Sequence, residues 1–149
     1  MNMKKIKIAI LLALALCVAG CKKAAPRGGD ITGEWKLQSY YGNAAASSQV
    51  SAMVYLNFKA DGTLELFQCL GDAGHFTAFT GTYETADGLL TGKYDGNTSS
   101  SWGGSYIYYA AADVLTLENS VLSGSGTCVY ERCAIPEEVR KDTSDYGAD

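Results

Sequence analysis

One run of residues opens the part of the chain that decides the fold: Ile31-Thr32-Gly33-Glu34-Trp35-Lys36-Leu37-Gln38-Ser39-Tyr40-Tyr41. Apolar and aromatic residues are mixed with polar ones here, which is typical of a strand, and a glycine stands near the start, as is common where a strand begins. Helical periodicity is almost absent from the residues that follow. The sequence therefore predicts an all-β domain whose strands are Gly33–Tyr41, Met53–Lys59, Thr63–Leu70, Phe76–Thr85, Leu89–Tyr94, Ser105–Ala110, Val114–Glu118 and Gly126–Cys133.

Short turn sequences separate these predicted strands. Asp61-Gly62 and Asp87-Gly88 lie between apolar-rich runs, where a hairpin turn requires positive φ, and Ala112-Asp113 marks another tight connection. Residues 31–135 provide about 13 residues per strand and turn, which is the even spacing of an antiparallel meander. Because a flat sheet of eight strands would leave two edges open, we expect an eight-stranded antiparallel up-and-down β-barrel.

The tripeptide Gly33-Glu34-Trp35 resembles the Gly-x-Trp motif of the lipocalin superfamily, whose last strand supplies a basic residue that packs over the tryptophan. Arg132 stands in the matching position. The order of segments up to Ile135-Pro136 is also similar to small lipocalin-like lipoproteins of Bacteroides-type bacteria. The resemblance implies structural roles for Gly33, Trp35 and Arg132. The indole would plug one end of the barrel, and the guanidinium would stack on it and donate to strand-end carbonyls.

The first 20 residues have the layout of a secretory signal. Lys4, Lys5 and Lys7 precede the apolar run Ile8–Leu16, which is shorter than the roughly 20 residues that span a bilayer. Val18-Ala19-Gly20-Cys21 resembles the lipobox at which bacteria attach lipid to the thiol and cleave before it. We therefore expect a lipid on Cys21 and a place in the cell envelope, at the outer membrane. The sequence does not decide which face of that membrane the protein occupies.

Residues 21–30 form a basic, glycine-containing stretch that we interpret as a flexible linker. It either lies against anionic lipid headgroups or is a solvated tether. The formal net charge of the whole chain is −4, and removal of the leader lysines makes it more negative. Such a surface repels phosphate backbones, so nucleic-acid binding is disfavoured.

The sequence offers little catalytic chemistry. His75 is the single histidine, and Cys69 and Asp72 precede it at intervals of three residues. These three residue types are metal ligands and nucleophiles, but the glycine-rich string around them is also typical of an exposed turn between strands. No Gly-x-Ser-x-Gly elbow or phosphate-binding loop occurs. We therefore predict no enzymatic activity, no metal site and no cofactor.

Three cysteines, Cys69, Cys128 and Cys133, follow the one expected to be lipidated. An odd number allows one disulfide at most and leaves one free thiol. In an up-and-down order, Cys69 ends the third strand and Cys128 begins the eighth, so both lie at the same rim. Cys69–Cys128 is the predicted bridge, and the alternative is that these are buried free cysteines.

Aromatic residues are the remaining indication of function. In the strand that begins at Ser105, Tyr106 and Tyr108 face one side, and they either line a cavity or fill it. The segments 42–49 and 97–104 join strands at the end opposite Trp35, and Trp102 in the second of them either touches a ligand or partner or packs on its own barrel. The predicted ligand-binding residues are Tyr41, Phe76, Tyr94, Trp102, Tyr106 and Tyr108.

Residues 31–135 are thus predicted to form one domain, followed at 136–149 by a short helical turn from Pro136 and a loose tail from Asp142. Two functions are compatible with this organisation. The first is a lipid-anchored barrel that binds or transports a small apolar or amphiphilic molecule. The second is a surface or periplasmic interaction module with a filled barrel and contact-forming loops. The sequence names neither the ligand nor a protein partner.

Overall fold

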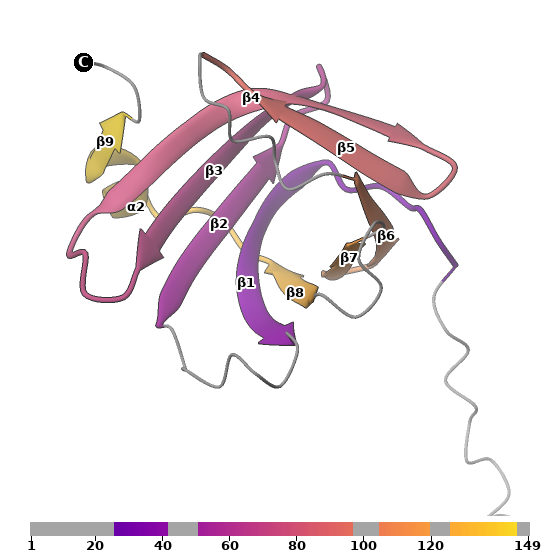
Figure 1. Cartoon of the computed structure of the whole chain (residues 1–149), viewed down its shortest axis with the longest axis horizontal. Helices are drawn as coiled ribbons and strands as arrows, with labels where there is room; N and C mark the ends of the chain where they lie inside the picture. The colour runs from indigo at the N-terminus through magenta and orange to yellow at the C-terminus, as the bar shows by residue number, and fades with distance from the viewer. Residues whose placement is uncertain (1–25, 42–50, 97–104, 120–125, 146–149) are drawn as a thin grey trace, which may run out of the picture.

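A computed structural model of the chain describes residues 26–41, 51–96, 105–119 and 126–145 (Figure 1). All eight predicted strands are present, with ends within one residue of the expected bounds. No helix among these residues is long and apolar enough to cross a membrane. The elements are β1 (Gly33–Tyr41), β2 (Ala52–Phe58), β3 (Thr63–Leu70), β4 (Phe76–Ala86), β5 (Leu89–Tyr94), β6 (Ser105–Ala111), β7 (Val114–Asn119), β8 (Thr127–Arg132), α2 (Glu137–Lys141) and β9 (Thr143–Asp145).

Strands β1 to β8 close into an antiparallel barrel. Each strand pairs with the next one along the chain, and β8 pairs back onto β1, so that every one of these eight strands has two neighbours. The resulting ring of strands is visible in Figure 1. The predicted up-and-down barrel is therefore confirmed.

The predicted hairpin turns are present, and residues within them have positive φ. Asp87 and Gly88, between β4 and β5, both have positive φ, at 50° and 75°. Ala112 has a φ of 50° in the two-residue connection between β6 and β7. In the turn before β3, the Asp61 carboxylate accepts hydrogen bonds from the backbone N–H of Thr63 at 2.9 Å and from its hydroxyl at 2.6 Å. These local contacts fix the turns that set the strand register.

Trp35 closes one end of the barrel, which we call the Trp35 end. Its side chain is fully buried, and its Nε1–H donates a hydrogen bond of 2.7 Å to the carbonyl of Ile31. The guanidinium carbon of Arg132 lies 4.1 Å from the centroid of the indole, and Arg132 Nη1 donates to the carbonyl of Thr32 at 2.8 Å. The geometry predicted for Trp35 and Arg132 is confirmed.

Gly33 is the residue that allows this stacking. It has a φ of 121°, and a Cβ at this position would lie 2.5 Å from Arg132 Nη1. A side chain here would thus occupy the space of the guanidinium and strain the backbone. Just before it, Gly28 donates to the carbonyl of Tyr108 and accepts from the N–H of Ala110, both at 2.8 Å. The last residues of the expected linker are therefore bonded to the barrel.

The C-terminal segment packs on the outside of β2, β3 and β4. Ile135 and Val139 are buried there against outward-facing side chains, and together they form the outer cluster: Tyr55, Phe67, Cys69, Phe76, Ile135 and Val139. The predicted helical turn is present as α2, which lies with β9 beside the start of β4 in Figure 1.

Beyond α2 the chain differs from the expected loose tail, because Thr143–Asp145 forms β9. This strand pairs in parallel with residues 76–78 of β4. The pairing of β5 with β4 covers only residues 81–86, so the first residues of β4 are free to bond β9. The unpaired edge of β4 therefore explains why this polar segment forms a strand, which its composition alone does not predict.

We predict that Arg132→Lys lowers the free energy of unfolding by about 1–2 kcal/mol. Lysine keeps the charge but loses the planar stacking on the indole and the aligned donor to Thr32. Urea unfolding of both proteins measures the difference.

Asp113→Ala is the matched control for that substitution. The Asp113 carboxylate lies 4.0 Å from Arg132 Nε and its side chain is 79% exposed, so its removal should change the free energy of unfolding by less than about 0.5 kcal/mol. Equal losses in the two variants would show that the surface ion pair, rather than the stacking, is what Arg132 provides.

Candidate functional site

Burial inside the barrel decreases away from the Trp35 end. The side chains of Trp35, Phe58 and Leu64 are at most 1% exposed, as are Leu56, Leu90 and Leu115. Other side chains that pack against this core are only half-buried. Tyr83 and Ala110 lie toward the Trp35 end, and the rest come from the opposite ends of the strands: Leu37, Val54, Phe79, Tyr94, Tyr106 and Cys128. Among the described residues, the less buried part of the interior is therefore the end opposite Trp35.

Four phenols and one thiol gather at that end, and we call Tyr40, Tyr94, Tyr106, Cys128 and Tyr130 the tyrosine cluster. Tyr130 is 7% exposed and lies deepest, while Tyr40 is 59% exposed. The rings of Tyr94 and Phe79 are 5.2 Å apart, so an apolar ring supports the phenol. The cluster combines aromatic faces with polar tips, which is the lining that an amphiphilic ligand requires.

Burial makes these groups weaker acids. It raises the pKa of Tyr94, of Tyr106 and of Tyr130 above the ordinary value for a phenol. Burial also raises the pKa of the Cys128 thiol, and a hydrogen bond with Tyr130 opposes part of that effect. Each group lies close enough to affect the ionisation of others in the cluster. The site therefore disfavours negative charge.

A β-bulge decides which tyrosine of β1 faces the interior. The pairing of β1 with β8 shifts between Leu37 and Ser39, after which Tyr40 pairs with Cys128 and Tyr41 with Thr127. Because paired residues share a face, Tyr40 turns inward with Cys128, and the predicted ligand residue Tyr41 turns outward, where it is 65% exposed. The extra residue of a bulge reverses the alternation of the strand, so Tyr41 does not face the interior as predicted.

Phe76 is also on the opposite face from the one predicted. Phe79 packs in the interior, and because alternate residues of a strand share a face, Phe76 points outward. It is 9% exposed in the outer cluster, with its ring 6.1 Å from that of Tyr55. Its contact with the C-terminal segment accounts for its burial.

The other predicted ligand residues have mixed outcomes. Tyr106 and Tyr108 share the inner face as expected, and Tyr94 joins Tyr106 in the tyrosine cluster. Tyr108 is instead part of the tight core at 5% exposure, with its hydroxyl near Gly28 at the Trp35 end. Trp102 lies outside the described residues.

Sequence reasoning missed three members of the tyrosine cluster as lining residues. Tyr130 and Cys128 lie two and four residues before Arg132, so the alternation of a strand places all three on one face. That spacing was available in the sequence. Tyr40 had no comparable indication, because nothing in β1 marks its bulge.

The predicted Cys69–Cys128 disulfide is not formed. Cys69, Cys128 and Cys133 are all free cysteines. Cys69 points outward into the outer cluster, whereas Cys128 packs in the interior. Although both lie near one rim, the wall of the barrel separates their side chains, so the alternative of free cysteines applies.

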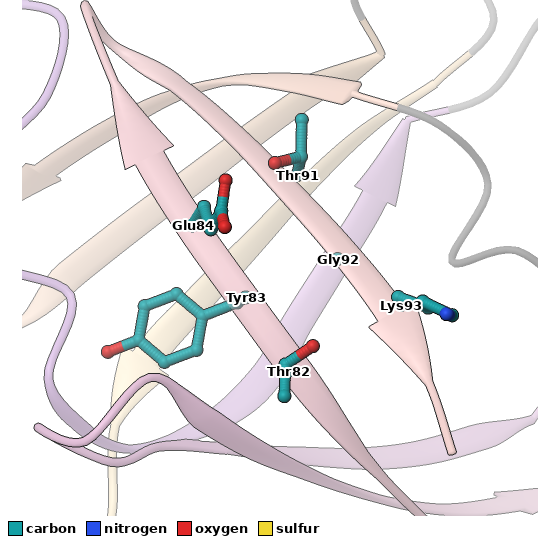
Figure 2. Close-up of a pocket in the computed structure, with 6 residues that line it drawn as sticks. All are labelled: Thr82, Tyr83, Glu84, Thr91, Gly92 and Lys93. Atoms are coloured by element: carbon teal, nitrogen blue, oxygen red, sulfur yellow. The ribbon is translucent and has the colours of Figure 1, made fainter. Parts of the chain in front are cut away.

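His75 lies in the predicted exposed turn between β3 and β4, with Gly71 to Gly74 also exposed. Within the described parts of the chain, no group of three His, Cys, Asp or Glu side chains is arranged to hold a metal ion. An open hollow of about 280 Å³ lies on the β4–β5 hairpin (Figure 2). It is lined by exposed polar side chains and by Gly92, opposite Tyr83. This lining does not suit an apolar ligand.

Comparisons with known proteins agree with this architecture. Residues 31–117, more than half of the chain, match the model of a lipocalin-like domain family. A lipocalin-like protein from Bacteroides uniformis is similar in structure, with 20% identity, a TM-score of 0.51, and coverage of 70% of this chain and 100% of that one. At this identity the likeness shows the fold alone.

A more distant structure is that of a protein described as REP1-NXSQ fatty acid transporter. It is 12% identical with a TM-score of 0.41, and the match covers 73% of this chain and 100% of that chain. Among curated protein sequences, no significant match was found.

We predict that the protein loses stability in alkaline solution through the tyrosine cluster. Since burial raises the pKa values of these phenols in the folded state, the stability that they contribute is complete below about pH 10 and is lost as the pH rises through the folded values. Tyr130→Phe should therefore flatten the alkaline decline in the free energy of unfolding, measured by urea titrations at a series of pH values.

Tyr41→Phe removes an exposed phenol and is the control, which should leave the alkaline decline unchanged. An equally steep decline in Tyr130→Phe and the unmodified protein would contradict the role assigned to the buried phenol.

Proposed function

The chain belongs to the lipocalin-like family, and from that premise we propose that it binds a small hydrophobic or amphiphilic molecule inside its barrel. The tyrosine cluster is the observation that supports this function. It places aromatic faces and hydroxyl groups on the inner wall, at the end where core side chains are only half-buried. Family membership supplies the expectation of binding, and the cluster supplies a place for it.

The arrangement of the two ends supports one direction of entry. At the Trp35 end, the indole, the guanidinium of Arg132 and the segment that contains Gly28 cover the core. At the other end, the half-buried residues Val54, Tyr94 and Tyr106 belong to three separate strands of the wall. A ligand that enters between their side chains replaces water on apolar surface, which is favourable.

The proposal includes an anchor in the cell envelope. The basic start, the short apolar run and the lipobox-like tetrad that ends at Cys21 support a lipid attached to that thiol. A lipid at the start of the chain would hold the barrel at the outer membrane. This location would give the protein access to apolar molecules that dissolve poorly in water.

The competing function, an interaction module with a filled barrel, depends on an exposed apolar surface around Trp102. That residue lies outside the described part of the chain, so no observation favours this alternative. Binding without catalysis remains our proposal for the barrel.

We predict that the full chain binds the uncharged fluorophore N-phenyl-1-naphthylamine, with a rise in its emission on transfer from water to the apolar interior. Val54→Trp should weaken this binding by about tenfold or more, equivalent to about 1.4 kcal/mol, because the larger side chain fills space at the accessible end. Fluorescence titration measures both affinities, and circular dichroism verifies that each variant folds.

Met53→Trp is the matched control, since Met53 precedes Val54 on the same strand but is exposed on the outer face. It should bind the fluorophore like the unmodified chain. If neither protein binds it, or if both tryptophan variants lose binding equally, the interior is not the binding site.

We predict that Cys21→Ser moves the protein from the membrane fraction to the soluble fraction of the cells that produce it. The serine hydroxyl does not accept the lipid, so the added acyl mass is lost as well, and fractionation with intact mass spectrometry detects both changes. Cys133→Ser should remain in the membrane fraction. An unaltered distribution of Cys21→Ser would contradict the anchor.

A further inference from the structure

The charged side chains of the barrel strands avoid its interior. In the described strands β1 to β8, those that alternate with core residues point outward, and no charged side chain is buried. The outward set is Glu34, Lys36, Glu65, Glu84, Lys93, Glu118 and Glu131. Arg132 alone shares the inner face, and its guanidinium is held at the Trp35 end by the indole and the Thr32 carbonyl.

The cations nearest to the apolar outer surface also have partners outside the barrel. Arg140 bonds the carboxylates of Glu34 and Glu65, and Lys59 lies 2.7 Å from Glu65. Lys36 lies over the ring of Tyr55, in the outer cluster. These contacts hold Arg140, Lys59 and Lys36 on the outside of the barrel, away from the tyrosine cluster.

The charged residues in the described connections at the end opposite Trp35 lie at the surface. Asp72 and His75, between β3 and β4, are exposed, and the exposed Asp95 after β5 accepts a hydrogen bond of 2.9 Å from the hydroxyl of Thr80. Among the described residues, an anionic or cationic head group at this end of the inner wall therefore has no partner of opposite charge. Burial of an unpaired charge is among the most unfavourable events in a protein interior.

The polar groups that are present at this end are neutral. The phenols of Tyr94, Tyr106 and Tyr130 and the thiol of Cys128 belong to the inner wall. A phenol both donates and accepts one or more hydrogen bonds, so it suits a hydroxyl, carbonyl or ether oxygen. Burial raises the pKa values of these same groups, which reflects the same aversion to negative charge.

We propose that the ligand of the tyrosine cluster is an uncharged amphiphile, with an apolar body and a hydroxyl, carbonyl or ether group, and that the site rejects long-chain carboxylates and ammonium ions. This inference rests on the proposed function and defines its ligand class. The phenols bond the polar group, while the side chains of Leu37, Val54 and Phe79 contact the apolar body.

Three ligands with one tail test this inference. Titration calorimetry of the full chain with n-decanol, decanoate and decyltrimethylammonium at neutral pH compares a neutral, a negative and a positive head on the same chain. We expect n-decanol to bind at least about tenfold more tightly than either ion, because each ion loses hydration without gaining a partner. Equal or tighter binding of decanoate would overturn the inference and leave ligand binding intact, whereas binding of none of the three would overturn the proposed function itself.

A charge placed at the bulge provides a second, independent arm. Tyr40→Arg puts a cation on the inner face at a position exposed enough to accept it, and it should strengthen decanoate binding by about tenfold. Tyr41→Arg adds the same charge to the outer face of the next residue and should leave decanoate binding unchanged. An equal effect of both variants would show that overall charge, rather than the inner wall, controls selection.

Discussion

The contact between the Arg132 guanidinium and the Trp35 indole is the interaction on which the rest of the barrel depends. The two residues are cross-strand partners in β1 and β8, where the first strand of the barrel meets the last. Their donors also satisfy the carbonyls of Ile31 and Thr32 in the segment that crosses this end. This stacked pair therefore lies at the seam where β1 and β8 complete the ring, buries the large apolar indole and fixes the segment that leads into β1.

Closure at the Trp35 end determines where function is possible. Since core side chains there are fully buried, the less buried part of the described interior is at the opposite end, where the tyrosine cluster lies. On the outside, Arg140 of α2 connects the carboxylates of Glu34 and Glu65, and the outer cluster covers apolar surface of β2, β3 and β4. The C-terminal segment thus stabilises the wall without occupying its interior.

Local sequence patterns predicted the barrel because the relevant physics is local, whereas its closed end was predicted from the resemblance to the lipocalin superfamily. Tight turns such as the one at Asp87 and Gly88 require positive φ, and the positions of these turns set the spacing of the strands. Gly33 and Trp35 form a short motif whose basic partner, Arg132, has a fixed place in the last strand. Each of these features depends on a few neighbouring residues or on one pair.

The candidate site was predictable only in part. Which residues line it depends on the face of the strand that each one occupies and on tertiary contacts. Because of a bulge in β1, Tyr40 faces the interior in place of Tyr41, and no residue type in that strand predicts the bulge. Phe76 and Cys69 are buried by Ile135 and Val139 of the C-terminal segment, and the sequence of that segment did not predict this packing. The alternation of strand residues alone predicted that Tyr106 faces the interior. It would also have predicted this for Cys128 and Tyr130 if their spacing to Arg132 had been used.

The central claim is a barrel closed by Trp35 that receives a neutral ligand among the tyrosines of its other end. The most direct test is an isotope-filtered nuclear Overhauser experiment on the full chain with ¹³C-labelled tyrosine and unlabelled n-decanol. The account predicts contacts from the ligand to the rings of Tyr94, Tyr106 and Tyr130, and none to Tyr55 in the outer cluster. Contacts confined to Tyr55 or to the exposed ring of Tyr41 would contradict it.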